Sequence, residues 1–70
     1  MKTPTLTQRK KEYQERIFQA LPKCKARDMV EQDILDGCQR IAFNPKKHTL
    51  KELWYAKDIV ECMAEREERQ

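Results

Sequence analysis

The sequence contains no serine, one glycine and one histidine, and these shortages limit the chemistry that its 70 residues can perform. A hydrolytic or transfer site needs a nucleophile, a base beside it and donors that stabilise the developing charge. With His48 as the single imidazole and no glycine-rich loop, the chain offers little from which to assemble such a set. Paired carboxylates at helical spacing are typical of a solvated surface. The composition therefore predicts a protein that binds rather than catalyses.

Long hydrophobic runs are also missing. A helix that crosses a bilayer needs about 20 predominantly apolar residues, and no stretch of this chain approaches that length. The first residues, 1–4, lead into polar sequence rather than into the apolar core of a secretory signal. We therefore expect no membrane contact and a cytoplasmic location.

Cysteines are few and widely spaced. Cys24, Cys38 and Cys62 are an odd number, unlike the dense even set of a disulfide-stapled secreted domain, so free thiols are expected. Together with His48 they have the composition of a zinc site, but zinc ligands usually come in pairs two to four residues apart. Cys24 lies between two lysines, a setting that favours a thiolate, yet no base is positioned beside it. We expect no metal and no other cofactor.

Capping signals and prolines divide the chain into three helices. The signals are Thr5 with Gln8, Asp28 with Glu31, and Thr49 with Glu52, the last pair having the best spacing and context for a capping box. Pro22 and the Asn44-Pro45 pair end the first two helices because proline withholds its N–H. The predicted helices cover about 5–21, 28–43 and 49–67.

Each predicted helix carries one apolar stripe at helical spacing. The stripes comprise Leu6, Tyr13, Ile17, Ala20 and Leu21; Val30, Ile34, Leu35, Cys38, Ile41 and Ala42; and Leu50, Leu53, Ala56, Val60, Met63 and Ala64. Three such helices with short connections can bury one shared core. The sequence therefore predicts an all-α fold, a small antiparallel three-helix bundle that forms a single domain over 1–70, with 1–4 and 68–70 frayed.

Two residues disagree with these stripes. Gly37 lies within the second helix, where glycine costs about 1 kcal/mol relative to alanine. Close approach of another helix, a kink, or the docking of a partner helix would each explain it. Lys10 lies near the middle of the first apolar arc, between Leu6 and Tyr13. Either Lys10 extends its amine to solvent at the bundle end, or the first two turns project as a basic arm.

Charge is distributed unevenly along the chain. Residues 1–27 hold eight Lys and Arg against two Glu, a net charge of +6, whereas residues 28–45 hold one Arg against four acids, a net charge of −3. A basic N-terminal segment is suited to an acidic partner or to phosphate. The residues predicted to contact a partner through charge are Arg9, Lys10, Lys11, Lys23, Lys25 and Arg27.

Three aromatic residues lie at the margins of the stripes. Trp54 and Tyr55 are adjacent, so on a helix they point about 100° apart and cannot both occupy the centre of the core. Phe18 is displaced in the same way from Ile17. Exposed aromatic side chains are common anchors in interfaces, and we expect these three to act so. The alternative is that they fill the two seams that each helix shares with its neighbours.

These observations favour a small non-enzymatic regulatory or adaptor protein that docks on a larger protein assembly. Its size would suit a factor encoded by a phage or other mobile element and directed at host transcription or replication machinery. The first alternative is direct binding of DNA or RNA through the basic N-terminal helix, and the second is a structural homodimer formed through the broad stripes. The sequence leaves the oligomeric state open between a monomer and a weak dimer.

Overall fold

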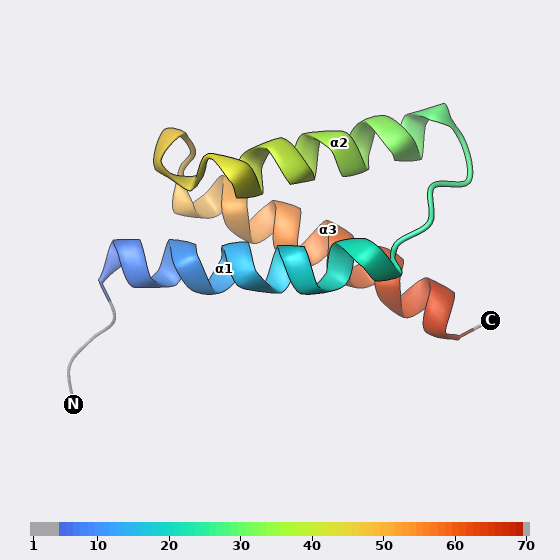
Figure 1. Cartoon of the computed structure of the whole chain (residues 1–70), viewed down its shortest axis with the longest axis horizontal. Helices are drawn as coiled ribbons and strands as arrows, with labels where there is room; N and C mark the ends of the chain where they lie inside the picture. The colour runs from blue at the N-terminus through green and yellow to red at the C-terminus, as the bar shows by residue number, and fades with distance from the viewer. Residues whose placement is uncertain (1–4, 70) are drawn as a thin grey trace.

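The computed structural model describes residues 5–69, and three α-helices contain most of them. They are α1 (Leu6–Ala20), α2 (Met29–Phe43) and α3 (Leu50–Glu68) (Figure 1). Two short 3₁₀ turns, η1 (Leu21–Lys23) and η2 (Pro45–Lys47), follow α1 and α2. Each turn begins at or beside a proline, as the predicted helix ends require. The three observed helices begin and end within one residue of the predicted boundaries.

The predicted caps start all three helices, but only one forms a complete capping box. Thr5 accepts a hydrogen bond from the Gln8 backbone N–H, and the Gln8 side chain accepts one from the Thr5 N–H. Thr49 likewise accepts from the Glu52 N–H, yet the Glu52 carboxylate turns to His48 Nδ1 at 2.6 Å. The expectation that Thr49 and Glu52 form the best capping box was therefore wrong, because His48 takes the carboxylate.

The helices pack in antiparallel succession, with contacts between all three pairs. Figure 1 shows α2 running back alongside α1, and α3 crossing behind them in the direction of α1. Ile17, Leu53 and Val60 are the largest fully buried side chains, one from α1 and two from α3. Most of the remaining core is small, contributed by Ala20, Cys38, Ala42, Ala56 and Ala64. The predicted all-α three-helix bundle is confirmed.

Two of the predicted stripes are partly wrong. Val30 is 67% exposed and Ile34 is 40% exposed, because α2 presents Leu35, Cys38 and Ala42 to the core instead. Those three positions share one side of a helix, about 100° from the line through Val30 and Ile34. Leu6 is also exposed. The first turn of α1 lies at the end of the bundle, beyond the buried part of the helix (Figure 1).

The structure excludes some of the alternatives that the sequence left open for Gly37 and Lys10. A Cβ added to Gly37 would meet nothing within 4 Å, so the predicted close approach of another helix is absent from the described residues. α2 continues unbroken through this position. Lys10 is half-buried, and η2 lies beside the first half of α1, so the basic segment is not a free arm (Figure 1).

The ends of the chain are described up to the last turn of α3. The helix includes Glu68, and the Arg69 N–H donates to the Glu65 carbonyl at 3.1 Å. The expected fraying of 1–4 and of residue 70 lies outside the described residues. No helix within residues 5–69 has the length and apolar character needed to span a membrane.

Candidate binding surface

The six basic residues predicted for partner contact lie at two ends of the molecule. Arg9, Lys10 and Lys11 belong to the first half of α1, whereas Lys23 is in η1 and Lys25 and Arg27 follow it. In Figure 1 these two groups occupy opposite ends of α1. They therefore cannot contact one small partner surface together, and each end has to be considered by itself.

At the α1–α2 connection, the cations pair with carboxylates of the same chain. Lys23 lies 3.5 Å from Glu68, and Arg27 lies 3.8 Å from Glu67, both on the last turn of α3. Ion pairs between side chains as exposed as these add little to the free energy of unfolding. Their effect is to reduce the positive potential at this end, so it is the weaker candidate for binding an anionic partner.

Arg66 of α3 organises the same end. Its guanidinium donates to both carboxylate oxygens of Glu31, at 2.9 and 3.1 Å, and to the Lys25 carbonyl at 3.2 Å. This bidentate bond ties α3 to α2. The bonds from Arg66 and from the Arg27 backbone N–H lower the pKa of Glu31 to about 2. Sequence spacing alone could not reveal this pair, because 35 residues separate its members.

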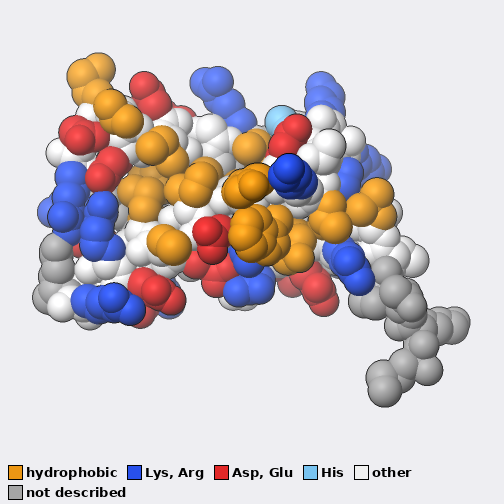
Figure 2. Space-filling model, turned by 180° about the vertical axis from the view of Figure 1, so that it is seen from behind, with side chains coloured by type: hydrophobic (Ala, Val, Ile, Leu, Met, Phe, Trp, Pro, Cys, Tyr) orange, Lys and Arg blue, Asp and Glu red, His pale blue; other side chains and the backbone are white. Residues whose placement is uncertain are grey.

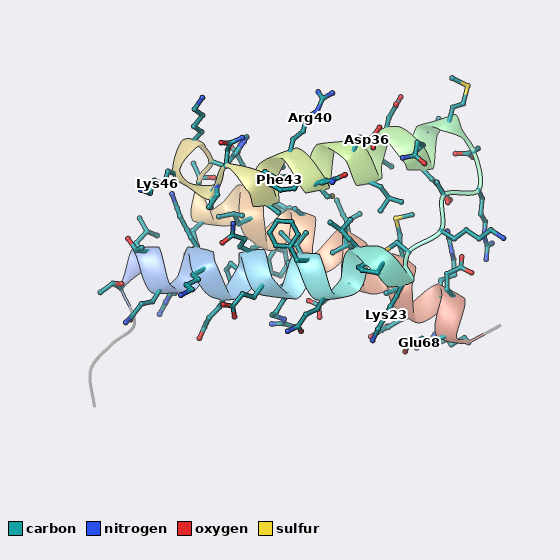
Figure 3. All side chains as sticks on the ribbon, viewed as in Figure 1. Lys23, Asp36, Arg40, Phe43, Lys46 and Glu68 are labelled. Carbon is teal, nitrogen blue, oxygen red and sulfur yellow. The ribbon has the colours of Figure 1, made fainter. Side chains whose placement is uncertain are left out.

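At the opposite end of the bundle, cations from three segments gather. Lys46 and Lys47 of η2 and Lys51 of α3 join the cations of α1, and Figure 3 shows Lys46 at the same end as the start of α1. Within residues 5–69, no carboxylate lies within ion-pair distance of any of these side chains. We call this group the basic end; it comprises Arg9, Lys10, Lys11, Lys46, Lys47 and Lys51.

A shallow aromatic hollow adjoins the basic end. It has a volume of about 410 Å³ and is lined by Tyr13, Leu50, Lys51, Trp54 and Tyr55, which we call the aromatic hollow. The Trp54 and Tyr55 rings meet edge to face, with centroids 5.3 Å apart, and are 42% and 51% exposed. Lys51 belongs to both groups, with its Nζ 5.9 Å from the Tyr55 ring. Lys51 therefore places the two exposed rings next to the basic end.

A buried lysine lies against two of the aromatic rings that line this hollow. Lys57 is only 9% exposed, and its Nζ lies 5.0 Å from the Trp54 ring and 5.5 Å from the Tyr13 ring. Its ammonium also lies 3.9 Å from Glu61. Cation–π contacts of this kind are worth more where water is excluded. Lys57 therefore fixes the orientation of Trp54 and Tyr13, a role that the sequence analysis missed.

Phe18, the third predicted anchor, lies elsewhere. Its ring meets Phe43 of α2 edge to face, with centroids 5.3 Å apart, and Phe18 itself is half-buried. Phe18 also packs against the core, whereas Phe43 is 61% exposed. Phe18 therefore fits the alternative interpretation, in which an aromatic side chain fills a seam between helices. The structure brings Trp54 and Tyr55 together but does not place Phe18 beside them.

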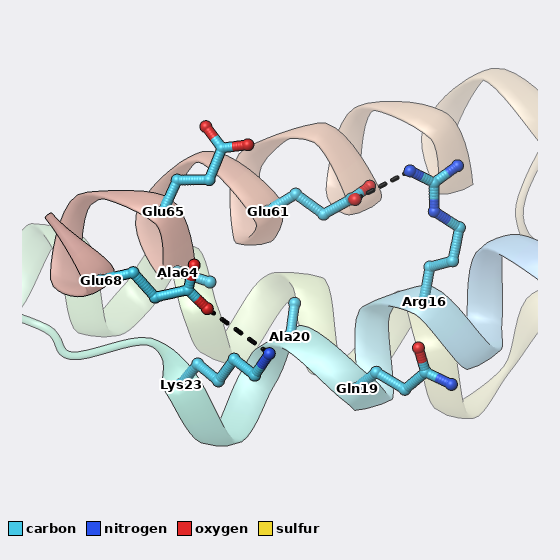
Figure 4. A pocket seen from close by; sticks show the side chains of 8 residues that line it. All are labelled: Arg16, Gln19, Ala20, Lys23, Glu61, Ala64, Glu65 and Glu68. Atoms are coloured by element: carbon cyan, nitrogen blue, oxygen red, sulfur yellow. Dashed lines mark hydrogen bonds and ion pairs between the residues drawn. The ribbon is translucent and has the colours of Figure 1, made fainter.

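A second hollow lies between α1 and α3 and is bridged by ion pairs (Figure 4). Arg16 donates to Glu61 at 2.8 Å, and Lys23 approaches Glu68 across the same opening. Its volume is about 200 Å³, and charged side chains form most of its lining. Four of its charged groups neutralise one another in pairs and, within the described residues, Glu65 is the one without an ion pair, so the hollow offers neither an apolar anchor site nor a cluster of unpaired charge.

The thiols and carboxylates of the described residues do not converge on a reactive centre. Cys24 Sγ lies 3.1 Å from the Val60 carbonyl and 3.3 Å from the Ala20 carbonyl, and burial raises the pKa of this thiol. The cationic setting read from its lysine neighbours therefore does not produce a thiolate. Burial also raises the pKa of Cys38. Within residues 5–69, no three His, Cys, Asp or Glu residues come together as a metal site would require.

The chain was compared with family models, with curated proteins and with solved structures. No family model matches, and no curated protein or solved structure matches either. On the surface of residues 5–69, the basic end and the aromatic hollow bring a cation without an ion pair next to two exposed rings.

Proposed function

We propose that this protein is a small non-enzymatic regulatory or adaptor protein, and that it docks on a larger protein assembly through the basic end and the aromatic hollow. The observation that carries the proposal is the continuity of the two groups at Lys51. Cations without internal partners lie directly beside two exposed rings. Neither the core nor the caps need these side chains, since the bundle buries other residues.

The chemistry of this surface defines the partner. Tyr55 and Trp54 present rigid apolar area that a shallow pocket on another protein can cover, and such aromatic anchors supply most of the binding energy in many interfaces. The surrounding lysines and Arg9 attract an acidic rim, which raises the association rate and orients the encounter. The partner should therefore carry an apolar pocket bordered by Asp and Glu.

The proposal also concerns the kind of assembly on which the protein docks. A protein of 70 residues that binds without chemistry would suit a factor encoded by a phage or other mobile element and directed at host transcription or replication machinery. Capture of the partner from extract identifies it directly.

The test is affinity capture from an extract of the cells that produce the protein, with wild type and two variants. Tyr55→Ala removes an exposed ring of the hollow, and Phe43→Ala removes a 61% exposed ring on α2 as a matched control. We expect one protein to be retained by wild type and Phe43→Ala after nuclease treatment, and to be absent with Tyr55→Ala. Equal retention by all three baits would contradict the proposal.

A second candidate function is direct binding of nucleic acid, and one observation favours it. The bundle brings Lys46 and Lys47 of η2 and Lys51 of α3 to the same end as Arg9, Lys10 and Lys11, which makes six cations without an ion pair at that end of the described chain. Exposed rings beside such a cluster also suit single strands, because bases stack on aromatic faces. On the same helices, Glu12 of α1 and Glu52 of α3 are acids that oppose phosphate binding.

Salt dependence distinguishes this candidate. Removal of one cation that binds a phosphate should reduce the slope of log affinity against log salt by about 0.9 for duplex DNA and about 0.7 for single strands. If nucleic acid is the ligand, Lys46→Ala and Lys47→Ala should each reduce that slope, whereas Lys23→Ala at the opposite end should leave it unchanged. Retention that survives nuclease and shows no such slope excludes this function.

A further inference from the structure

We propose that two copies of this chain associate through α2, with the two helices antiparallel and packed along the stripe Val30, Ile34, Gly37 and Ile41, of which Val30 and Ile34 are exposed and Gly37 and Ile41 half-buried. This inference concerns a different face from the basic end and stands independently of the proposed function. It rests on the spacing of the stripe, on the charges at its edge and on the space around Gly37.

The stripe has the spacing of a helix–helix seam. Its members are four, three and four residues apart, as in the a and d positions of a coiled coil. It lies beside the buried line of α2 rather than in it, so Val30 and Ile34 remain exposed and Ile41 is half-buried. Figure 2 shows hydrophobic side chains gathered in a band on the face opposite to that of Figure 1.

α3 extends this apolar surface. Ile59 is 39% exposed and lies two helical turns before Arg66, the residue that bonds to Glu31 of α2. Positions seven apart share a helix face, so Ile59 lies on the side of α3 that borders α2. The apolar surface therefore continues from the stripe of α2 onto α3.

The charges at the edge of the stripe specify a second copy in antiparallel orientation. Asp33 and Arg40 are seven residues apart on the same edge of α2, and within residues 5–69 neither side chain makes an ion pair or a hydrogen bond. Figure 3 shows Arg40 pointing away from the bundle. In an antiparallel pair, Asp33 of each copy faces Arg40 of the other, whereas in a parallel pair these two positions would face Cys38 and Pro45 of the second copy and no opposite charges would meet.

This arrangement explains why a glycine stands at position 37. Within one copy nothing approaches its Cβ position, and φ is not positive, so the fold does not require glycine there. In the antiparallel pair, Gly37 faces Ile34 of the second copy, and Val30 faces Ile41. The missing side chain lets the two helices approach closely and receive the isoleucine. A residue that costs stability in the isolated bundle thus serves the contact.

The contact is small, which favours a weak and transient association. α2 has 15 residues and is therefore about 22 Å long. A single pair of helices of this length buries on the order of half of the about 800 Å² per partner found in a standard interface. We therefore expect a weak dimer, with a dissociation constant on the order of 10–100 μM.

The test is sedimentation of the full chain from 5 to 500 μM (about the range that brackets such a constant), with a charge exchange at the edge of the stripe. Asp33→Arg and Arg40→Asp should each weaken association about tenfold or more, because each places like charges opposite each other. The double variant recreates two opposite-charge pairs and should return to within about threefold of wild type. Glu15→Arg, the same charge change on an exposed residue of α1, should leave association unchanged.

A second variant checks the packing. Gly37→Gln fits the single copy, where the position is open, and should retain the helical circular dichroism signal while losing association. A wild-type chain that stays monomeric at 500 μM would overturn the proposal. So would a double charge exchange that fails to restore association, or a Gly37→Gln variant that still dimerises. If the chain stays monomeric and instead binds a helix of an unrelated protein, the proposal would also be contradicted.

Discussion

Replacement of Gly37 by alanine should stabilise the isolated bundle. The position is the ninth of the 15 residues of α2, well inside the helix, and the added methyl group meets nothing within 4 Å. Alanine gains the propensity that glycine lacks, about 1 kcal/mol, without a steric cost. For a domain of this size we expect a rise in the melting temperature of about 4–8 °C.

The assay is urea unfolding followed by circular dichroism at low micromolar concentration, below the expected dissociation constant of the dimer. Gln39→Gly, at an exposed position of the same helix, is the matched control and should lose a similar amount of free energy of unfolding. If Gly37→Ala is neutral or destabilising while Gln39→Gly behaves as expected, then the space around Gly37 is not open and the reasoning is refuted.

Three further predictions concern the core, the Arg66 bond and the thiols. Leu53→Ala, at a fully buried position, should cost about 3 kcal/mol in the free energy of unfolding, measured by urea titration; a cost below about 1 kcal/mol would contradict its place in the core. Because the folded pKa of Glu31 is about 2, below its ordinary value of 4.5, its stabilising contribution is present above pH 4.5. That contribution should disappear as the pH falls from 4.5 to 2. Arg66→Gln should therefore flatten the plot of the free energy of unfolding against pH in this range. An unchanged plot would refute the role of the bond between Arg66 and Glu31. A thiol reagent should modify exposed Cys62 quickly, half-buried Cys24 more slowly and buried Cys38 only on unfolding, and equally fast modification of all three would show that burial does not protect them.

The helices could be predicted from the sequence because their signals are local. Thr5, Asp28 and Thr49 are side chains that cap the residues immediately following them, and Pro22 and Pro45 act on their own backbone. Such signals do not depend on the rest of the fold. The helix boundaries were accordingly confirmed to within one residue.

The face of α2 could not be predicted in the same way. Apolar residues cover about half of its circumference, from Val30 through Ile34 to Leu35, so the hydrophobic pattern allows more than one direction of burial. The choice depends on long-range contacts, including the bond between Glu31 and Arg66 and the bond from Gln14 Nε2 to the Ala42 carbonyl at 2.7 Å. Neither contact can be recognised from the neighbouring residues in the sequence.

The candidate surface was predicted only in part. Trp54 and Tyr55 were correctly placed outside the centre of the core, and Arg9, Lys10 and Lys11 do lie in the basic end. The contribution of η2 was missed because charge was counted along the chain, where residues 46–70 balance. Net charge counted along the sequence does not show that the turn after α2 returns to the start of α1. The antiparallel arrangement of the helices does imply this proximity.

The affinity of the captured partner for Tyr55→Ala, compared with its affinity for Phe43→Ala, tests the account most directly. Isothermal titration with the purified partner gives both dissociation constants under the same conditions. The account predicts that Tyr55→Ala loses about 2 kcal/mol, about 30-fold in Kd, while Phe43→Ala stays within about threefold of wild type. Wild-type affinity for Tyr55→Ala, or an equal loss for both variants, would contradict the claim that the aromatic hollow is the docking surface.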